Sequence, residues 1–74
     1  MSKTFSGKEV INILCRFFGF VVVSQKGSHV KLNKKLEGKT IITVVPLHTE
    51  LKKGTLSGVL QLAEVNMNDF MEKR

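Results

Sequence analysis

The 74-residue sequence predicts an α+β domain whose elements follow the order α-β-β-β-α. Three observations support this class: an N-terminal segment with helical periodicity, three consecutive runs rich in β-branched residues, and a second amphipathic segment. Strands joined by short turns favour a three-stranded antiparallel sheet. Because each of the two helices must bury an apolar face, we expect both on one face of the sheet, leaving the other face open.

The first helix is expected to begin at about Gly7. Ser6 and Glu9 have the spacing of a capping box, in which each side chain accepts a hydrogen bond from the other residue's backbone N–H. One arc of roughly 200° then contains the apolar residues Val10, Ile11, Ile13, Leu14, Cys15, Phe17 and Phe18. This wide arc predicts a largely buried helix face, and Gly19 is expected to end the helix in a left-handed conformation.

The strands are expected at residues 20–24, 29–32 and 39–45, and the third stops at Pro46. Residues 25–28 and the polar residues 33–38 are interpreted as turns. Apolar residues occur at consecutive positions in the first and third strands, so both faces of these strands carry apolar groups. Either the open face contacts a partner, or loops and the C-terminal segment cover it.

The second helix is expected to be capped by Thr55, after a loop over residues 47–54. Its apolar face comprises Leu56, Val59, Leu60, Leu62 and Ala63. Residues 68–73 can form a last helical turn. At this length we expect residues 1–74 to form a single domain with a thin margin of stability.

The charge distribution makes nucleic acid the first partner to consider. Twelve Lys and Arg oppose six Asp and Glu, giving a net charge of +6, and most of the excess lies between Lys26 and Lys53. Concentrated positive charge favours a polyanion through counterion release, although lysines also serve simply to keep a small domain soluble.

Several other classes are disfavoured by the residue inventory. No apolar run approaches the roughly 20 residues needed to cross a bilayer. We therefore expect no membrane partner. The single cysteine cannot form an internal disulfide, whereas a small secreted domain usually needs several, so we expect a cytoplasmic protein. Two widely separated histidines and scattered carboxylates form no metal-ligand pattern, and phosphate-binding and dinucleotide fingerprints are missing. We therefore expect neither a metal nor a cofactor.

The element Gly27-Ser28-His29 is the strongest candidate for chemistry. If Val30 and Leu32 point toward the helices, His29 and Lys31 share the opposite face, because strand side chains alternate. An imidazole can take or give a proton near neutral pH, and RNA supplies its own nucleophile in the ribose 2′-OH. Lys26 or Lys31 would then offset phosphate charge. The alternative is that His29 is an ordinary solvated or hydrogen-bonded residue.

Four further residues are weaker candidates. His48 either shares the acid–base work or is a loop residue packed against the sheet edge. Lys52 and Lys53 precede a helix N-terminus, which favours phosphate, yet they can equally be solvated lysines. Ser28 could orient His29 or touch RNA, although serine is common in turns.

Five elements in order resemble the HicA family of toxins, also described as YcfA-like mRNA interferases of type II toxin–antitoxin modules. They are Ser6-Gly7-Lys8-Glu9, Phe18-Gly19-Phe20, Gln25-Lys26-Gly27-Ser28-His29, Val45-Pro46-Leu47-His48 and Leu51-Lys52-Lys53-Gly54-Thr55-Leu56. The resemblance implies a fold like that of double-stranded-RNA-binding domains and metal-independent endoribonuclease activity on mRNA, with His29 as the catalytic residue.

The resemblance also implies a partner. Such toxins pair with a HicB antitoxin that covers the active face and usually carries a DNA-binding domain, so that contact with DNA is only indirect. Where family members often have Gly-Leu after the second helix, this chain has Glu64-Val65. Two other functions stay open from the residues alone: a non-catalytic module that binds double-stranded RNA through its lysines, and a purely partner-binding role.

Overall fold

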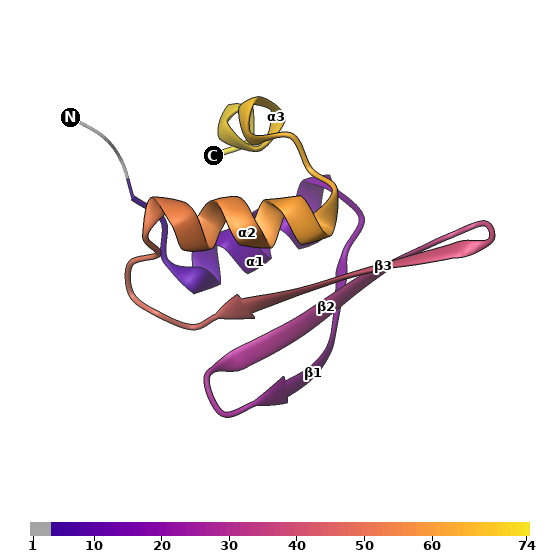
Figure 1. Ribbon diagram of the computed structural model, residues 1–74, viewed down its shortest axis with the longest axis horizontal. Helices are drawn as coiled ribbons and strands as arrows, with labels where there is room; N and C mark the ends of the chain where they lie inside the picture. The colour runs from indigo at the N-terminus through magenta and orange to yellow at the C-terminus, as the bar shows by residue number, and fades with distance from the viewer. Residues whose placement is uncertain (1–3) are drawn as a thin grey trace.

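The computed structural model describes residues 4–74 (Figure 1). Its elements are α1 (Gly7–Phe17), β1 (Val21–Lys26), β2 (His29–Leu36), β3 (Lys39–Pro46), α2 (Lys53–Ala63) and α3 (Met67–Glu72). The strands form one antiparallel sheet in the order β1-β2-β3. The expected α-β-β-β-α order is confirmed, and α3 follows it as a short third helix.

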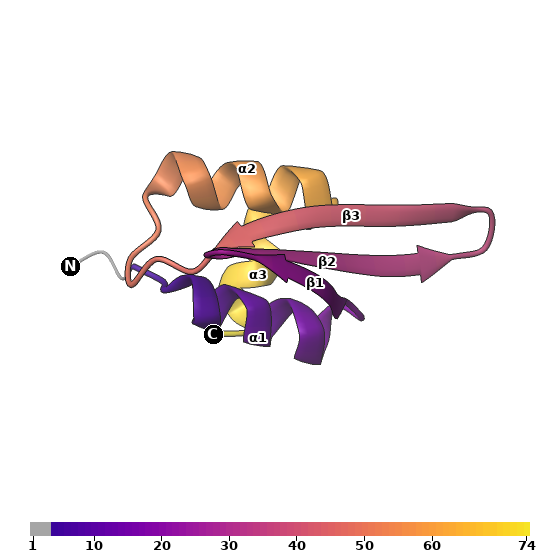
Figure 2. The same cartoon turned by 90° about the horizontal axis from the view of Figure 1, so that it is seen from below.

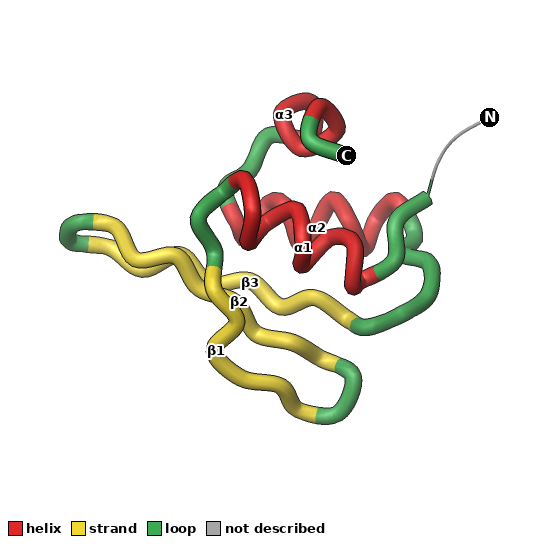
Figure 3. The backbone as a smooth tube through the Cα atoms, turned by 180° about the vertical axis from the view of Figure 1, so that it is seen from behind, coloured by secondary structure: helices red, strands yellow, loops and turns green. Residues whose placement is uncertain are grey.

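Both long helices lie on one face of the sheet, as predicted (Figures 1 and 3). Burial alternates along β3: Thr43 and Val45 are fully buried beneath the helices, whereas Ile42 and Val44 are 45% and 38% exposed. The surface that carries Ile42 and Val44 is called the open face here. Since these side chains remain exposed, neither the loops nor the C-terminal segment seals this face, and that alternative was wrong.

Local sequence signals explain how α1 begins and ends. The Ser6 hydroxyl accepts a 3.0 Å hydrogen bond from the Glu9 N–H, and the Ser6 N–H donates to Glu9 Oε1 over 2.9 Å. Gly19 follows the C-terminal cap with a φ of +79°, so both predicted ends are confirmed. Phe17 was expected on the buried face but is 48% exposed, because the predicted arc is wider than the surface that the helix buries.

The short helix α3 completes the core on the helical side. Phe70 is fully buried and meets Phe5 edge to face, with ring centroids 5.2 Å apart. The Asn66 side chain caps the helix by accepting hydrogen bonds from two backbone N–H groups. A C-terminal helical turn was expected, and it contributes a central core residue.

One buried hydroxyl links β3 to α2. Thr43 Oγ1 donates a 2.9 Å hydrogen bond to the Val59 carbonyl, so this polar group satisfies its bonding within the core. Figure 2 shows α2 running alongside β3. In residues 4–74 no helix has both the length and the apolar character to cross a membrane.

Three predicted boundaries were wrong. The first strand starts at Val21 and continues to Lys26, because the chain turns only at residues 27–28. The second strand continues to Leu36 rather than turning after Leu32, and the β2–β3 hairpin extends past the helices (Figure 1). In that protruding part both faces meet solvent, so polar residues replace the alternating pattern that marks a half-buried strand.

The second helix also departs from expectation. It begins at Lys53, with Lys52 as its N-cap, and no side chain forms the cap bond that Thr55 was expected to supply. Leu62, which was assigned to the apolar face, is 60% exposed. The neighbouring Ala63 is 2% exposed, and at 100° per residue Leu62 lies about 100° away from it around the helix, outside the arc that the core covers.

Candidate functional site

His29 is the first residue of β2 and projects from the open face. It pairs with Lys26 on β1 and with Pro46 on β3. Its neighbours Val30 and Leu32 are buried toward the helices, so alternation directs His29 outward, as the sequence predicts. Among residues 4–74 its exposed side chain forms no hydrogen bond or ion pair. The imidazole is therefore accessible to a substrate.

A β-bulge in β1 brings Lys26 to the same face as His29. The register changes between Val22, which pairs with Leu32, and Ser24, which pairs with Lys31. Without this change Val22, Ser24 and Lys26 would share a face; with the extra residue, Val22 lies on the helical side and Lys26 on the open side. The bulge thus places a lysine directly opposite His29 on the neighbouring strand.

Two hydrogen bonds, one from β1 and one from the loop after β3, stabilise the turn before His29. Gly27 has a φ of +59°, a conformation that costs glycine little in a two-residue hairpin turn. The Gln25 side-chain amide donates to the Gly27 carbonyl over 3.0 Å, and the Leu47 N–H donates to the Ser28 carbonyl over 2.6 Å. These bonds fix the backbone that carries the histidine, and they tie the turn to the loop after β3.

The Ser28 side chain does not orient the ring. Within the described residues its hydroxyl forms no hydrogen bond to His29, so the orienting role proposed for it has no support. Ser28 is exposed beside the imidazole, and its contact with RNA stays a prediction.

The cationic surface continues along β2 beyond the predicted residues. Lys31 lies on the open face between Ser24 and Val44. Two positions farther are Asn33 and then Lys35, which follow the same alternation. Sequence reasoning missed these two because it assigned residues 33–38 to a turn; the signal available was the spacing of two along the polar residues His29, Lys31, Asn33 and Lys35.

The contacts of His48 are with the residues at the start of α1. It is exposed in the loop after β3, where its carbonyl accepts a 2.9 Å hydrogen bond from the Gly7 N–H. Its side chain lines a shallow pocket with Ser6 and Lys8 at the start of α1. In the part of the chain that is described, no hydrogen bond or ring contact joins the two histidines. A shared acid–base role stays a prediction.

Lys52 and Lys53 flank the exposed N-terminus of α2, where backbone N–H groups and the helix dipole favour anions. The α2 N-terminus and the β1–β2 turn lie at the same end of the molecule (Figures 1 and 3). A phosphate chain passing His29 can therefore continue toward these lysines, which keeps their predicted anchoring role open.

The remaining titratable groups do not build a metal or thiol site. Within residues 4–74, no three His, Cys, Asp or Glu side chains come together. Cys15 is half-buried on α1 and packs against the core. Burial raises the pKa of its thiol, which disfavours the nucleophilic thiolate.

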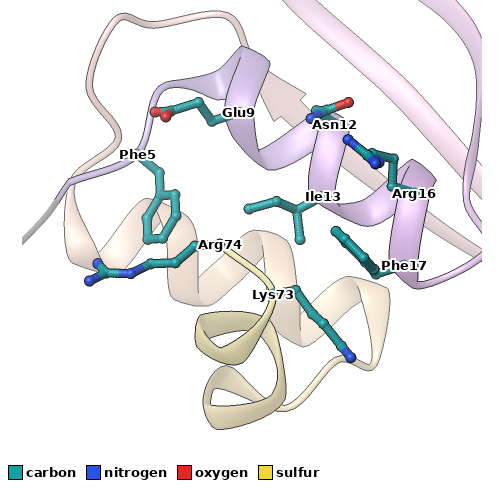
Figure 4. A pocket seen from close by; sticks show the side chains of 8 residues that line it. All are labelled: Phe5, Glu9, Asn12, Ile13, Arg16, Phe17, Lys73 and Arg74. Carbon is teal, nitrogen blue, oxygen red and sulfur yellow. The ribbon is translucent and has the colours of Figure 1, made fainter.

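A cavity of about 270 Å³ lies between α1 and the C-terminal residues (Figure 4). Arg16 Cζ and Lys73 Nζ each lie 5.6 Å from the centroid of the Phe17 ring, a cation–π geometry that helps to explain how this ring tolerates exposure. None of the predicted site residues lines this cavity. It is separate from the open face.

Comparison with known proteins adds one finding. The family model described as the HicA toxin of bacterial toxin–antitoxin systems matches residues 7–65, a range that includes α1, the sheet with His29, and α2. The helix α3 lies beyond the matched range. No curated protein that was compared matches the chain.

Proposed function

Because the chain belongs to the HicA family of bacterial toxin–antitoxin toxins, we propose that it is a metal-independent endoribonuclease that cleaves mRNA through His29. The observation that carries this proposal is the exposed His29 side chain beside Lys26, on a face that also presents Lys31. None of the three strands contains an acidic residue, so nothing within the sheet opposes the approach of a phosphodiester.

The chemistry that fits this arrangement is transesterification. The ribose 2′-oxygen bonds to the adjacent phosphorus while the bond from phosphorus to the 5′-oxygen breaks. His29 takes the 2′-OH proton as a base or, when protonated, gives a proton to the leaving oxygen; water exchanges the other proton. Lys26 and Lys31 offset the negative charge on the non-bridging phosphate oxygens. The products carry a 2′,3′-cyclic phosphate and a free 5′-hydroxyl.

The test uses purified protein and RNA in excess chelator. Wild type is expected to cleave, and His29→Ala to reduce the rate by about 10²–10⁴-fold, the range of a general acid–base contribution. Because His29 is exposed and unbonded within residues 4–74, His29→Ala should keep the unfolding temperature of wild type. In cells, wild-type expression should arrest growth and the alanine variant should not. An alanine variant as toxic as wild type would refute the assignment.

The same assay separates the second candidate function, a non-catalytic module that binds double-stranded RNA. The fold order and the lysines at the α2 N-terminus support this alternative. It predicts a shifted but intact RNA band in the gel, whereas the nuclease predicts fragments without added metal.

We further propose that the antitoxin partner is of the HicB type and covers the open face. Val21 is 57% exposed there, and Ile42 and Val44 add two more exposed apolar side chains. Ile42→Asp should weaken the complex with a HicB-type antitoxin that binds the wild-type chain. The matched control is Leu62→Asp, which alters an aliphatic residue on α2 that is 60% exposed, against 45% for Ile42. Equal loss of binding in both variants would contradict an interface on the open face. DNA contact is expected only through the antitoxin.

A further inference from the structure

The exposed side of β2 is a straight row of polar side chains that begins at His29. The row, called the β2 track here, comprises His29, Lys31, Asn33 and Lys35. The register with β3 is regular along the whole strand, from His29 opposite Pro46 to Leu36 opposite Lys39, so all four residues keep to one face. At about 3.3 Å per residue, the track is roughly 20 Å long.

We propose that the β2 track binds the sugar–phosphate backbone of single-stranded RNA on one side of the cleaved bond, with Lys35 as its distal phosphate contact. This inference rests on the proposed ribonuclease function. Lys31 is already a predicted contact, whereas Asn33 and Lys35 extend the site by about 13 Å beyond it. The substrate is then a segment of several nucleotides rather than a single phosphodiester.

The surroundings of the track favour single-stranded nucleic acid over an acidic protein segment. Lys31 lies in the centre of the sheet beside Val44 on β3, and the next residue of the track, Asn33, lies between two exposed apolar side chains, Val21 on β1 and Ile42 on β3. Lys35 lies past the end of β1, where β2 pairs with β3 alone. A flexible strand can lay its phosphates on the two lysines while its sugars and bases contact the apolar groups between them. The open face offers no aromatic ring in the three strands, so little base preference is expected.

The chain contains a matched control for Lys35. Lys34 is its immediate neighbour but points to the opposite side of β2, where its Nζ lies 6.0 Å from the centroid of the Phe20 ring. Lys34→Ala therefore removes the same charge from the same strand without altering the track. Both variants have the same net charge, so a difference in their RNA binding must come from the face of the sheet on which each lysine lies.

The experiment measures cleavage of RNA substrates extended stepwise on either side of the cleaved bond. Lys35→Ala is expected to raise the KM of long substrates by about threefold to tenfold, and to do so only when the extension is on one side. The rise in KM should become smaller as the RNA extension on that side of the cleaved bond is shortened. Lys34→Ala should match wild type. For Lys35→Ala, the slope of log affinity against log salt should decrease by about 0.7, the value expected for one lost single-strand phosphate contact.

Equal KM values for the two variants on long substrates would overturn the proposal, as would a Lys35→Ala effect that is independent of substrate length. A binding assay with RNA that carries a 2′-deoxyribose at the cleaved position separates this failure from failure of the proposed function. If wild type cleaves nothing but Lys35→Ala still binds this probe more weakly than Lys34→Ala, the track stands and the nuclease assignment fails. If cleavage depends on His29 and both lysine variants bind the probe equally well, the nuclease assignment stands and the proposal for the β2 track fails.

Discussion

The Nζ atom of Lys39 lies 2.9 Å from Oε1 of Glu64, and this ion pair joins the first residue of β3 to the residue that ends α2. Glu64 has a left-handed backbone, with φ of 57° and ψ of 39°. The resemblance to the HicA family implies glycine at this position. The chain keeps the left-handed turn without glycine, and Val65 still packs against the core.

Glu64→Gly is expected to raise the free energy of unfolding by about 0.5 kcal/mol. Relief of the left-handed strain is worth about 1 kcal/mol and exceeds the loss of one exposed ion pair, although glycine also gains freedom in the unfolded chain. Urea denaturation measures the change. Glu64→Ala is the control, because it loses the ion pair and keeps the strain; a glycine variant less stable than the alanine variant would contradict this account.

Gly7→Ala is expected to destabilise the fold by about 1–3 kcal/mol. A methyl group at Gly7 would overlap the Pro46 carbonyl, so α1 could not keep its close approach to the end of β3. Gly58→Ala offers the opposite case within α2, because the added methyl group meets no atom within 4 Å and alanine favours the helix by about 0.5–1 kcal/mol. In chemical denaturation, the free energy of unfolding of Gly58→Ala should be higher than that of wild type, and that of Gly7→Ala should be lower.

Phe70→Ala is expected to cost about 3–5 kcal/mol, because it removes a fully buried ring that contacts Phe5. Since that loss can exceed the whole stability of a small domain, Phe70→Leu provides a smaller step, and it should lower the unfolding temperature measurably. Met71→Ala alters the next residue, which is 38% exposed, and should change stability by less than about 1 kcal/mol. A loss of stability for Phe70→Ala as small as that for Met71→Ala would contradict a core role for α3.

Cys15 should react slowly with iodoacetamide. Burial raises the pKa of its thiol, so at any given pH near 8 a smaller fraction is thiolate in the folded protein than in the unfolded chain. The rate should climb as pH increases toward that raised pKa. Mass spectrometry of alkylated protein, with and without urea, measures the ratio of the labelling rates of the folded protein and the unfolded chain. Faster labelling of the folded protein than of the unfolded chain would contradict the assignment.

The sequence predicted the elements that periodicity and local capping define. The capping box at Ser6 and Glu9 and the left-handed Gly19 bounded α1 correctly, and alternation around Val30 directed His29 outward. The length of β2 was missed because residues beyond Leu32 pair with β3 where no helix covers them, so hydrogen bonds continue after the apolar alternation has ended.

Contacts between distant parts of the chain explain the other differences. The start of α2 was misjudged because Lys52 forms no side-chain cap bond, which leaves no local signature. The hydrogen bond from Leu47 to Ser28 depends on the pairing of β2 with β3, which brings the loop after Pro46 beside the β1–β2 turn. No pattern within either segment predicts it.

The bond from Leu47 to Ser28 has a consequence for the order in which the chain can fold during synthesis. The Gln25 bond to Gly27 lies within the β1–β2 turn and can form as soon as that turn has left the ribosome. The Leu47 bond needs the residues after β3, and the bond from Leu51 to Phe5 needs a residue made later still. The support that the far loop gives to the backbone of the histidine is therefore added only after most of the chain has been made.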